Sequence, residues 1–157
     1  MLRETAMNRR VLVAATILLL TPSGATAMPQ NAEIKDVVER YAKAWAAGDT
    51  AAIMASYGDD VVFHYGGRNA LSGDHVGKAA ALRALSDFSR RTERRLIAIV
   101  DVMAGGERGV VIAREALGKG DARVEVERTL VYRVQSGRID ECWVYDADQA
   151  LVDRLVG

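Results

Sequence analysis

Four β-like runs separated by short glycine-containing turns fill the second half of the chain, and they restrict its fold more than any other feature. The runs are RRLIAIVDVM (94–103), GVVIAREAL (109–117), RVEVERTLVYRVQ (123–135) and IDECWVY (139–145). The turns between them, AGGER, GKGDA and SGR, are of hairpin length. Parallel strands need a crossover of roughly a dozen residues or more, so turns this short predict antiparallel neighbours. We therefore expect a four-stranded antiparallel meander.

The segment NAEIKDVVERYAKAWAAGD (31–49) has helical periodicity instead. Its apolar residues follow the i, i+3, i+4, i+7 spacing of one buried stripe, namely Ile34, Val37, Val38, Tyr41 and Trp45. Gly48 is placed to end this helix, and Asp49 is placed to cap a short second helix over TAAIMASY (50–57). The domain thus opens with a long amphipathic helix and a short one.

Three further elements complete the predicted order. VVFHY (61–65) is rich in β-branched and aromatic residues, which favours a strand, and GGRNALSGDHVG (66–77) is predicted to be a long loop. KAAALRALSDFSR (78–90) returns to the helical period, and DADQALVDRLV (146–156) predicts a closing helix. Helices and strands largely occupy different parts of the sequence, so the fold class is α+β with a mostly antiparallel sheet.

The first 27 residues have the pattern of a signal peptide. A basic stretch from Met7 to Arg10 precedes the apolar run VLVAATILLL (11–20), and Ala25 and Ala27 give the small-x-small pattern of a signal-peptidase site. Ten apolar residues are too few for a membrane-spanning helix, which needs about 20. We expect cleavage, export to the periplasm or the medium, no stable membrane anchor, and a single domain over 28–157. A retained anchor is the alternative.

Charge and cysteine content exclude several classes of function. Removing residues 1–27 takes away three Arg and one Glu, which leaves 18 basic and 20 acidic side chains and a net charge of −2. This balance gives no electrostatic reason to expect a nucleic-acid partner. Cys142 is the only cysteine, so an internal disulfide is impossible. There is no P-loop, dinucleotide fingerprint or nucleophile elbow, and we expect no cofactor.

The order of several phrases resembles the SnoaL-like domain of the nuclear transport factor 2-like superfamily. These phrases are YAKAWAAGD (41–49), DDVVFH (59–64), LSGDHVGKAA (71–80) and VYRVQSGRIDECWVYDADQALVDRL (131–155). The resemblance implies a cone-like curved sheet wrapped around the N-terminal helices, an interior ligand pocket, and a homodimer formed through the sheet. Relatives include ketosteroid isomerases, polyketide cyclases and limonene-epoxide hydrolases. Such a fold suggests a pocket but does not specify a reaction.

His64 and Glu141 are the candidate catalytic residues. An imidazole aimed into the cone by a family-like register could act as a general base or hydrogen-bond donor near neutral pH. Glu141 shares a strand face with Trp143 and Tyr145, and it could be the carboxylate partner of His64. The alternatives are a half-exposed His64 satisfied by backbone or water, and a solvated sheet face with Trp143 at a dimer interface.

The candidate substrate-binding walls are aromatic: Trp45, Phe63, Trp143 and Tyr145. Cross-strand pairing on a wet face explains most of the charged residues on the neighbouring strands, including Arg114 and Arg128. An Arg turned inward would instead need a carboxylate partner. No Asp–Arg–Asp set of the kind found in epoxide-hydrolase relatives is evident, which makes epoxide hydrolysis a minor option. His64 and His75 lack the spacing of metal ligands, and we expect no metal site.

The favoured hypothesis is an exported domain that binds a small apolar molecule in a cone-shaped pocket. Its chemistry, if any, would be proton transfer next to a carbonyl, as in isomerases and cyclases, without a cofactor. The alternative is a non-catalytic ligand-binding or dimerisation module. His64 and Glu141 together inside a cavity would favour the enzyme, whereas a purely apolar pocket would favour the binding module.

Overall fold

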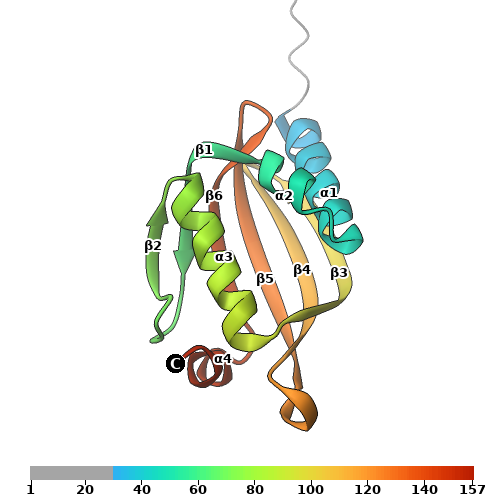
Figure 1. Cartoon of the computed structure of the whole chain (residues 1–157). Coiled ribbons are helices and arrows are strands. Elements are labelled where there is room, and N and C mark those ends of the chain that lie inside the picture. Colours follow the sequence, from blue (N-terminus) through green and yellow to red (C-terminus); the bar gives the residue numbers. More distant parts are fainter. Residues whose placement is uncertain (1–29) are drawn as a thin grey trace, which may run out of the picture.

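The computed structural model describes residues 30–157 (Figure 1). The predicted signal peptide, residues 1–27, lies outside the described residues. The helices are α1 (Gln30–Ala47), α2 (Thr50–Ser56), α3 (Lys78–Thr92), the short 3-10 helix Gly120–Ala122 and α4 (Gln149–Val156). The strands are β1 (Tyr57–Tyr65), β2 (Gly73–Val76), β3 (Arg95–Gly105), β4 (Arg108–Leu117), β5 (Val124–Gln135) and β6 (Arg138–Asp146). No helix within 30–157 is both long and apolar enough to cross a membrane.

The strands form one sheet in the order β2-β1-β6-β5-β4-β3. The meander β3 to β6 is antiparallel throughout, as the short turns predict, whereas β1 runs parallel to β6. The predicted α+β class is confirmed, with a sheet that is curved and open (Figure 1). Strand β2 was predicted as loop, because four residues that begin with glycine and stay mostly exposed carry no apolar alternation.

The long helices α1 and α3 lie on the inner, concave face of the sheet (Figure 1). Helix α1 packs against β3, β4 and β5, while α3 packs against β1 and β2. The inner face is therefore buried; the described part of the chain places no long helix across the outer face (Figure 1).

The apolar stripe of α1 is buried as predicted, from Ile34 at 1% exposure to Trp45 at 9%. Gly48 ends the helix with a φ of +67°, and the Asp49 carboxylate accepts a hydrogen bond from the Ala52 amide at 2.9 Å to start α2. Sheet and helix approach closely along the first half of α1: a Cβ added at Gly109 of β4 would collide with Val38. This close approach fixes α1 relative to the sheet.

Candidate functional site

A groove of about 390 Å³ separates α2 from α3. Its lining residues are Thr50, Ile53, Met54, Leu82, Leu85, Ser86, Ser89 and Arg94. The walls are mostly apolar, and the large side chains on them stay partly exposed because the two helices do not close over one another. Arg94, which joins α3 to β3, is the one charged residue of this lining. An apolar groove with a single cationic group is the usual design of a small-molecule site.

The Arg94 guanidinium is held in place from several directions. Its Nε donates to Ser89 Oγ at 2.7 Å, and its Nη1 donates to Glu115 Oε1 at 3.2 Å. Its Cζ also lies 5.8 Å from the ring centroids of Trp45 and Phe88. The side chain remains 20% exposed. Arg94 is therefore a positioned hydrogen-bond donor at the groove rather than a mobile surface arginine.

Behind Arg94 lies a buried set of charges that spans three strands. Arg128 of β5 donates through Nη1 to Glu115 Oε2 of β4 at 3.0 Å, and its guanidinium forms an ion pair with Asp146 of β6. Glu115 is fully buried and Arg128 is 1% exposed. Each of the two carboxylates has an arginine partner, as buried charges require.

Aromatic groups and burial set the electrostatics of this cluster. The Arg128 Cζ lies 4.0 Å from the Phe88 ring centroid. Burial alone would lower the pKa of Arg128, but Tyr65, Asp146 and Glu115 raise it above its usual value, so the guanidinium stays protonated. Burial raises the pKa of the Asp146 carboxyl, and Arg128 offsets part of that shift. The Tyr65 hydroxyl is buried without a hydrogen-bond partner within 30–157.

The sequence allowed for an inward arginine with a carboxylate partner, but it did not identify the residues of this cluster. Arg128 was expected on a wet face, but it lies on the inner one; Arg114, in contrast, is exposed as predicted. The signal was present in the alternation of β5, since Val126 and Leu130, two residues to either side of Arg128, are both buried. Asp146 pairs with Arg128, and it is Asp148 that caps α4 through the Leu151 amide at 2.9 Å.

The structure brings His64 and Glu141 together on the outer face of the sheet. His64 Nδ1 lies 2.7 Å from Asp74 Oδ1, and His64 Nε2 lies 3.8 Å from Glu141 Oε1. The neighbours that point inward from β1 are Phe63 and Tyr65, which are buried. The pair therefore lies across the sheet from the groove, and its predicted catalytic role stays a prediction.

The four predicted walls divide between the two faces. Trp45 and Phe63 are buried on the inner face, and Trp45 borders the groove through its contact with Arg94. Trp143 and Tyr145 are on the outer face, where the Trp143 ring stacks on His64 with centroids 4.9 Å apart. The outer pair cannot contribute to a ligand site between the helices, and neither Trp45 nor Phe63 is among the residues that line the groove.

The two histidines do not converge on a common site. His64 pairs with Asp74 in the β1–β2 register and His75 pairs with Phe63, so the two imidazoles point to opposite faces. His75 Nε2 donates to the Leu71 carbonyl at 2.8 Å. Among residues 30–157, no three potential ligands cluster in a way that could hold a metal ion.

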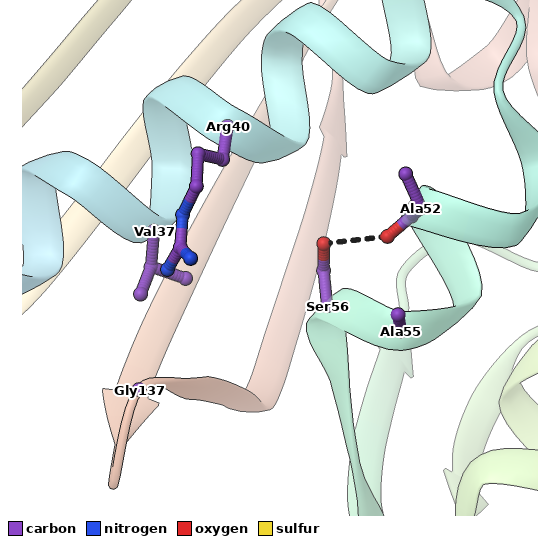
Figure 2. Close-up of a pocket in the computed structure, with 6 residues that line it drawn as sticks. All are labelled: Val37, Arg40, Ala52, Ala55, Ser56 and Gly137. Atoms are coloured by element: carbon purple, nitrogen blue, oxygen red, sulfur yellow. Dashed lines mark hydrogen bonds between the residues drawn. The ribbon is translucent and has the colours of Figure 1, made fainter.

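A smaller hollow of about 220 Å³ lies between α1, α2 and the β5–β6 turn (Figure 2). It is lined by Val37, Arg40, Ala52, Ala55, Ser56 and Gly137. The Ser56 hydroxyl donates back to the Ala52 carbonyl of its own helix at 2.9 Å, and Arg40 pairs with Asp36 at 3.3 Å on the surface. Its polar groups are thus occupied locally, which makes the groove at Arg94 the stronger candidate.

Known structures share this fold at low sequence identity. Bal32a from a soil-derived mobile gene cassette aligns with a TM-score of 0.72 and 20% identity, covering 82% of this chain and 100% of that one. An NTF2-like protein from Burkholderia xenovorans aligns at 0.65 and 21%, covering 81% and 98%. An LEH-like epoxide hydrolase from M. tuberculosis aligns at 0.58 and 23%, covering 82% and 94%. These similarities establish the fold alone.

Sequence comparison identifies the family. No curated protein is similar enough in sequence to be matched to this chain. The SnoaL-like domain family, however, matches residues 38–142, which is most of the described region and runs from α1 to β6. The chain therefore belongs to the SnoaL-like domain family, and its fold is that of the NTF2-like proteins.

Proposed function

We propose that this SnoaL-like domain binds a small, largely apolar molecule in the groove between α2 and α3. The observation that carries the proposal is Arg94, a positioned and partly exposed guanidinium in a largely apolar groove that has no other charged residue. Apolar walls supply the binding free energy, at about 25 cal/mol per Å² of buried surface, and a polar group at one end fixes the orientation of the ligand.

A thermal-shift screen against hydrophobic ketones, aromatic polyketide-like compounds, steroids and terpenes tests this proposal. A ligand present at a hundred times its Kd should add about 2.7 kcal/mol of stability. Leu85→Trp fills the groove and should abolish the shift. Leu151→Trp is the matched control, because Leu151 is also a partly buried leucine but belongs to α4 outside the groove. Equal shifts in both variants would contradict binding in the groove.

Acid–base catalysis by the buried cluster is the second candidate function. The observation that favours it is the carboxylate–arginine–carboxylate arrangement of Glu115, Arg128 and Asp146 directly behind Arg94. In this candidate the reaction is proton transfer next to a carbonyl, with Glu115 as the base once a ligand oxygen takes the Arg94 hydrogen bond. His64 and Glu141 are less suited, since they lie on the outer face.

Exchange of ligand protons with solvent deuterium distinguishes an enzyme from a non-catalytic binding module. A ligand found in the screen is incubated with the protein in D₂O, and deuterium incorporation next to its carbonyl is followed by NMR. Glu115→Gln should abolish the incorporation while His64→Ala leaves it intact. A ligand that binds without any exchange would support the non-catalytic module. An epoxide series tests hydrolysis, the reaction named for the M. tuberculosis neighbour.

Export and homodimerisation complete the proposal. The pattern of residues 1–27 supports export by a cleaved signal peptide. Support for a dimer through the outer face of the sheet comes from its apolar side chains: Tyr145 is 55% exposed and Met103 is 43% exposed there. Apolar groups on an open sheet face are typical of protein interfaces.

A further inference from the structure

We propose that the molecule bound in the groove is an anion, with its apolar body between α2 and α3 and a carboxylate bound by Arg94. The inference rests on the binding function proposed above and adds the chemical class of the ligand.

The charges behind the groove alternate in sign. From β6 towards the groove, the ion pairs join Asp146 to Arg128, Arg128 to Glu115 and Glu115 to Arg94. The charges along this row are therefore negative, positive, negative and positive, and the last of them, the Arg94 cation, lies at the groove. A negatively charged group is the one that continues this alternation.

Arg128 is an arginine of this interior that has a carboxylate partner on each side. Its guanidinium lies between two carboxylates, Asp146 and Glu115, and it is almost completely buried. Arg94 holds only one carboxylate, Glu115, at 3.2 Å. A ligand carboxylate would give Arg94 the same arrangement that Arg128 already has.

One nitrogen of the Arg94 guanidinium, Nη2, is available to bind a ligand carboxylate. Nε is engaged by Ser89 and Nη1 by Glu115, whereas Nη2 has no hydrogen-bond partner among residues 30–157. The two engaged nitrogens fix the plane of the guanidinium, which lowers the entropy cost of binding a ligand. Guanidinium–carboxylate hydrogen bonds are about twice as strong as neutral ones.

The surroundings of Arg94 also favour an anion. No acidic side chain lines the groove itself. The adjoining stretch from residue 90 to 95 carries four arginines against the single Glu93. A local excess of positive charge raises the concentration of anions near the groove and speeds their association.

Matched pairs of probes test the inference by isothermal titration calorimetry on the full chain at pH 7. The pairs are 2-naphthoate with 2-acetonaphthone, and decanoate with decan-2-one, so each pair keeps one apolar body and changes the polar end. The carboxylate of each pair should bind at least about tenfold more tightly, as expected for hydrogen bonds to a charged partner.

Arg94→Gln should remove this preference and leave the Kd of the ketones within about threefold. Arg94→Lys should keep part of it. Arg154→Gln, an exposed arginine on α4 outside the groove, is the control and should change nothing.

The outcomes separate the inference from the function on which it rests. Ketones that bind as tightly as the acids, with both unaffected by Arg94→Gln, would overturn the anion proposal and leave apolar binding intact. Failure of all four probes to bind would contradict the binding function itself. The wild-type comparison within each pair decides the matter even if an Arg94 variant does not fold.

Discussion

Arg128 and Asp146 occupy directly paired positions on the antiparallel strands β5 and β6, and their side chains form a buried ion pair on the inner face. The strand register thus determines which charged side chains meet in the interior. Glu115, two residues beyond the position on β4 that pairs with Arg128, completes the cluster. The same residue links the cluster to the groove through Arg94.

Removing the central arginine should cost more than any surface change. Arg128→Met removes the arginine partner of the buried Asp146 and leaves the buried Glu115 with Arg94 alone, and we expect a loss of about 3–5 kcal/mol in the free energy of unfolding. The loss is measured by urea unfolding of the variant and the wild type. Arg114→Met is the control: Arg114 is exposed on β4, and its loss should stay within about 0.5 kcal/mol. A loss below about 1 kcal/mol for Arg128→Met would show that Arg128 does not stabilise the buried carboxylates as described.

The close approach of α1 to the sheet makes a second prediction. Gly109→Ala places a methyl group against Val38, whose branched side chain has little freedom to move, and should destabilise the protein by about 1–3 kcal/mol. Gly105→Ala is the control, because a Cβ there meets no atom within 4 Å. Thermal unfolding of both variants decides the point, and equal melting temperatures would contradict the packing of α1 on β4.

Acid should weaken the attachment of α4 to the β1–β2 loop. A hydrogen bond from the Asn69 amide, with others from the Arg68 backbone and Gln149, lowers the pKa of the Asp153 carboxyl. A lowered folded-state pKa stabilises the protein above the unfolded value of about 3.9, and that stability is lost as pH falls through the folded value. Asp153→Asn should therefore melt earlier than wild type at pH 7.

The difference should shrink below about pH 4, where Asp153 is protonated first in the unfolded chain and, at still lower pH, in the folded protein. Melting curves from pH 7 to pH 3 follow it. Asp121→Asn, on the 3-10 helix, serves as the control for a general effect of removing a carboxylate. A gap between Asp153→Asn and wild type that stays constant over this range would exclude the proposed linkage.

Two exposed methionines on opposite sides of the sheet test the proposed dimer. Met103 is 43% exposed on the outer face, and Met54 is 39% exposed on α2 at the groove. Met103→Glu buries a charge in an outer-face interface and should shift the protein towards a monomer, whereas Met54→Glu should not. Light scattering after size exclusion reports the mass. A wild-type monomer, or equal effects of the two changes, would count against an outer-face dimer.

The regular pattern of the sequence was enough to predict most of the fold. The stripe from Ile34 to Trp45 and the glycine-containing turns 104–108 and 136–138 carry strong local signals, and helix α1 and the meander follow from them. Strand β2 escaped prediction because its pairing with β1 is a long-range contact with no apolar alternation behind it.

The site was less accessible from sequence. Alternation correctly grouped Glu141 with Trp143 and Tyr145, but it does not say which face of a sheet the helices cover. Arg94 was expected to begin the β-like run 94–103, but it lies in the turn between α3 and β3. Its role depends on Glu115, which lies 21 residues away in the sequence, and only the folded chain brings the two together.

The position of a bound ligand tests the central claim most directly. Crystals of the complex with 6-bromo-2-naphthoate would place the bromine by its anomalous scattering. The account predicts a single strong peak between α2 and α3, beside Leu82 and Leu85, with the carboxylate at Arg94. A peak on the outer face of the sheet near Trp143, or in the hollow beside Arg40, would contradict it.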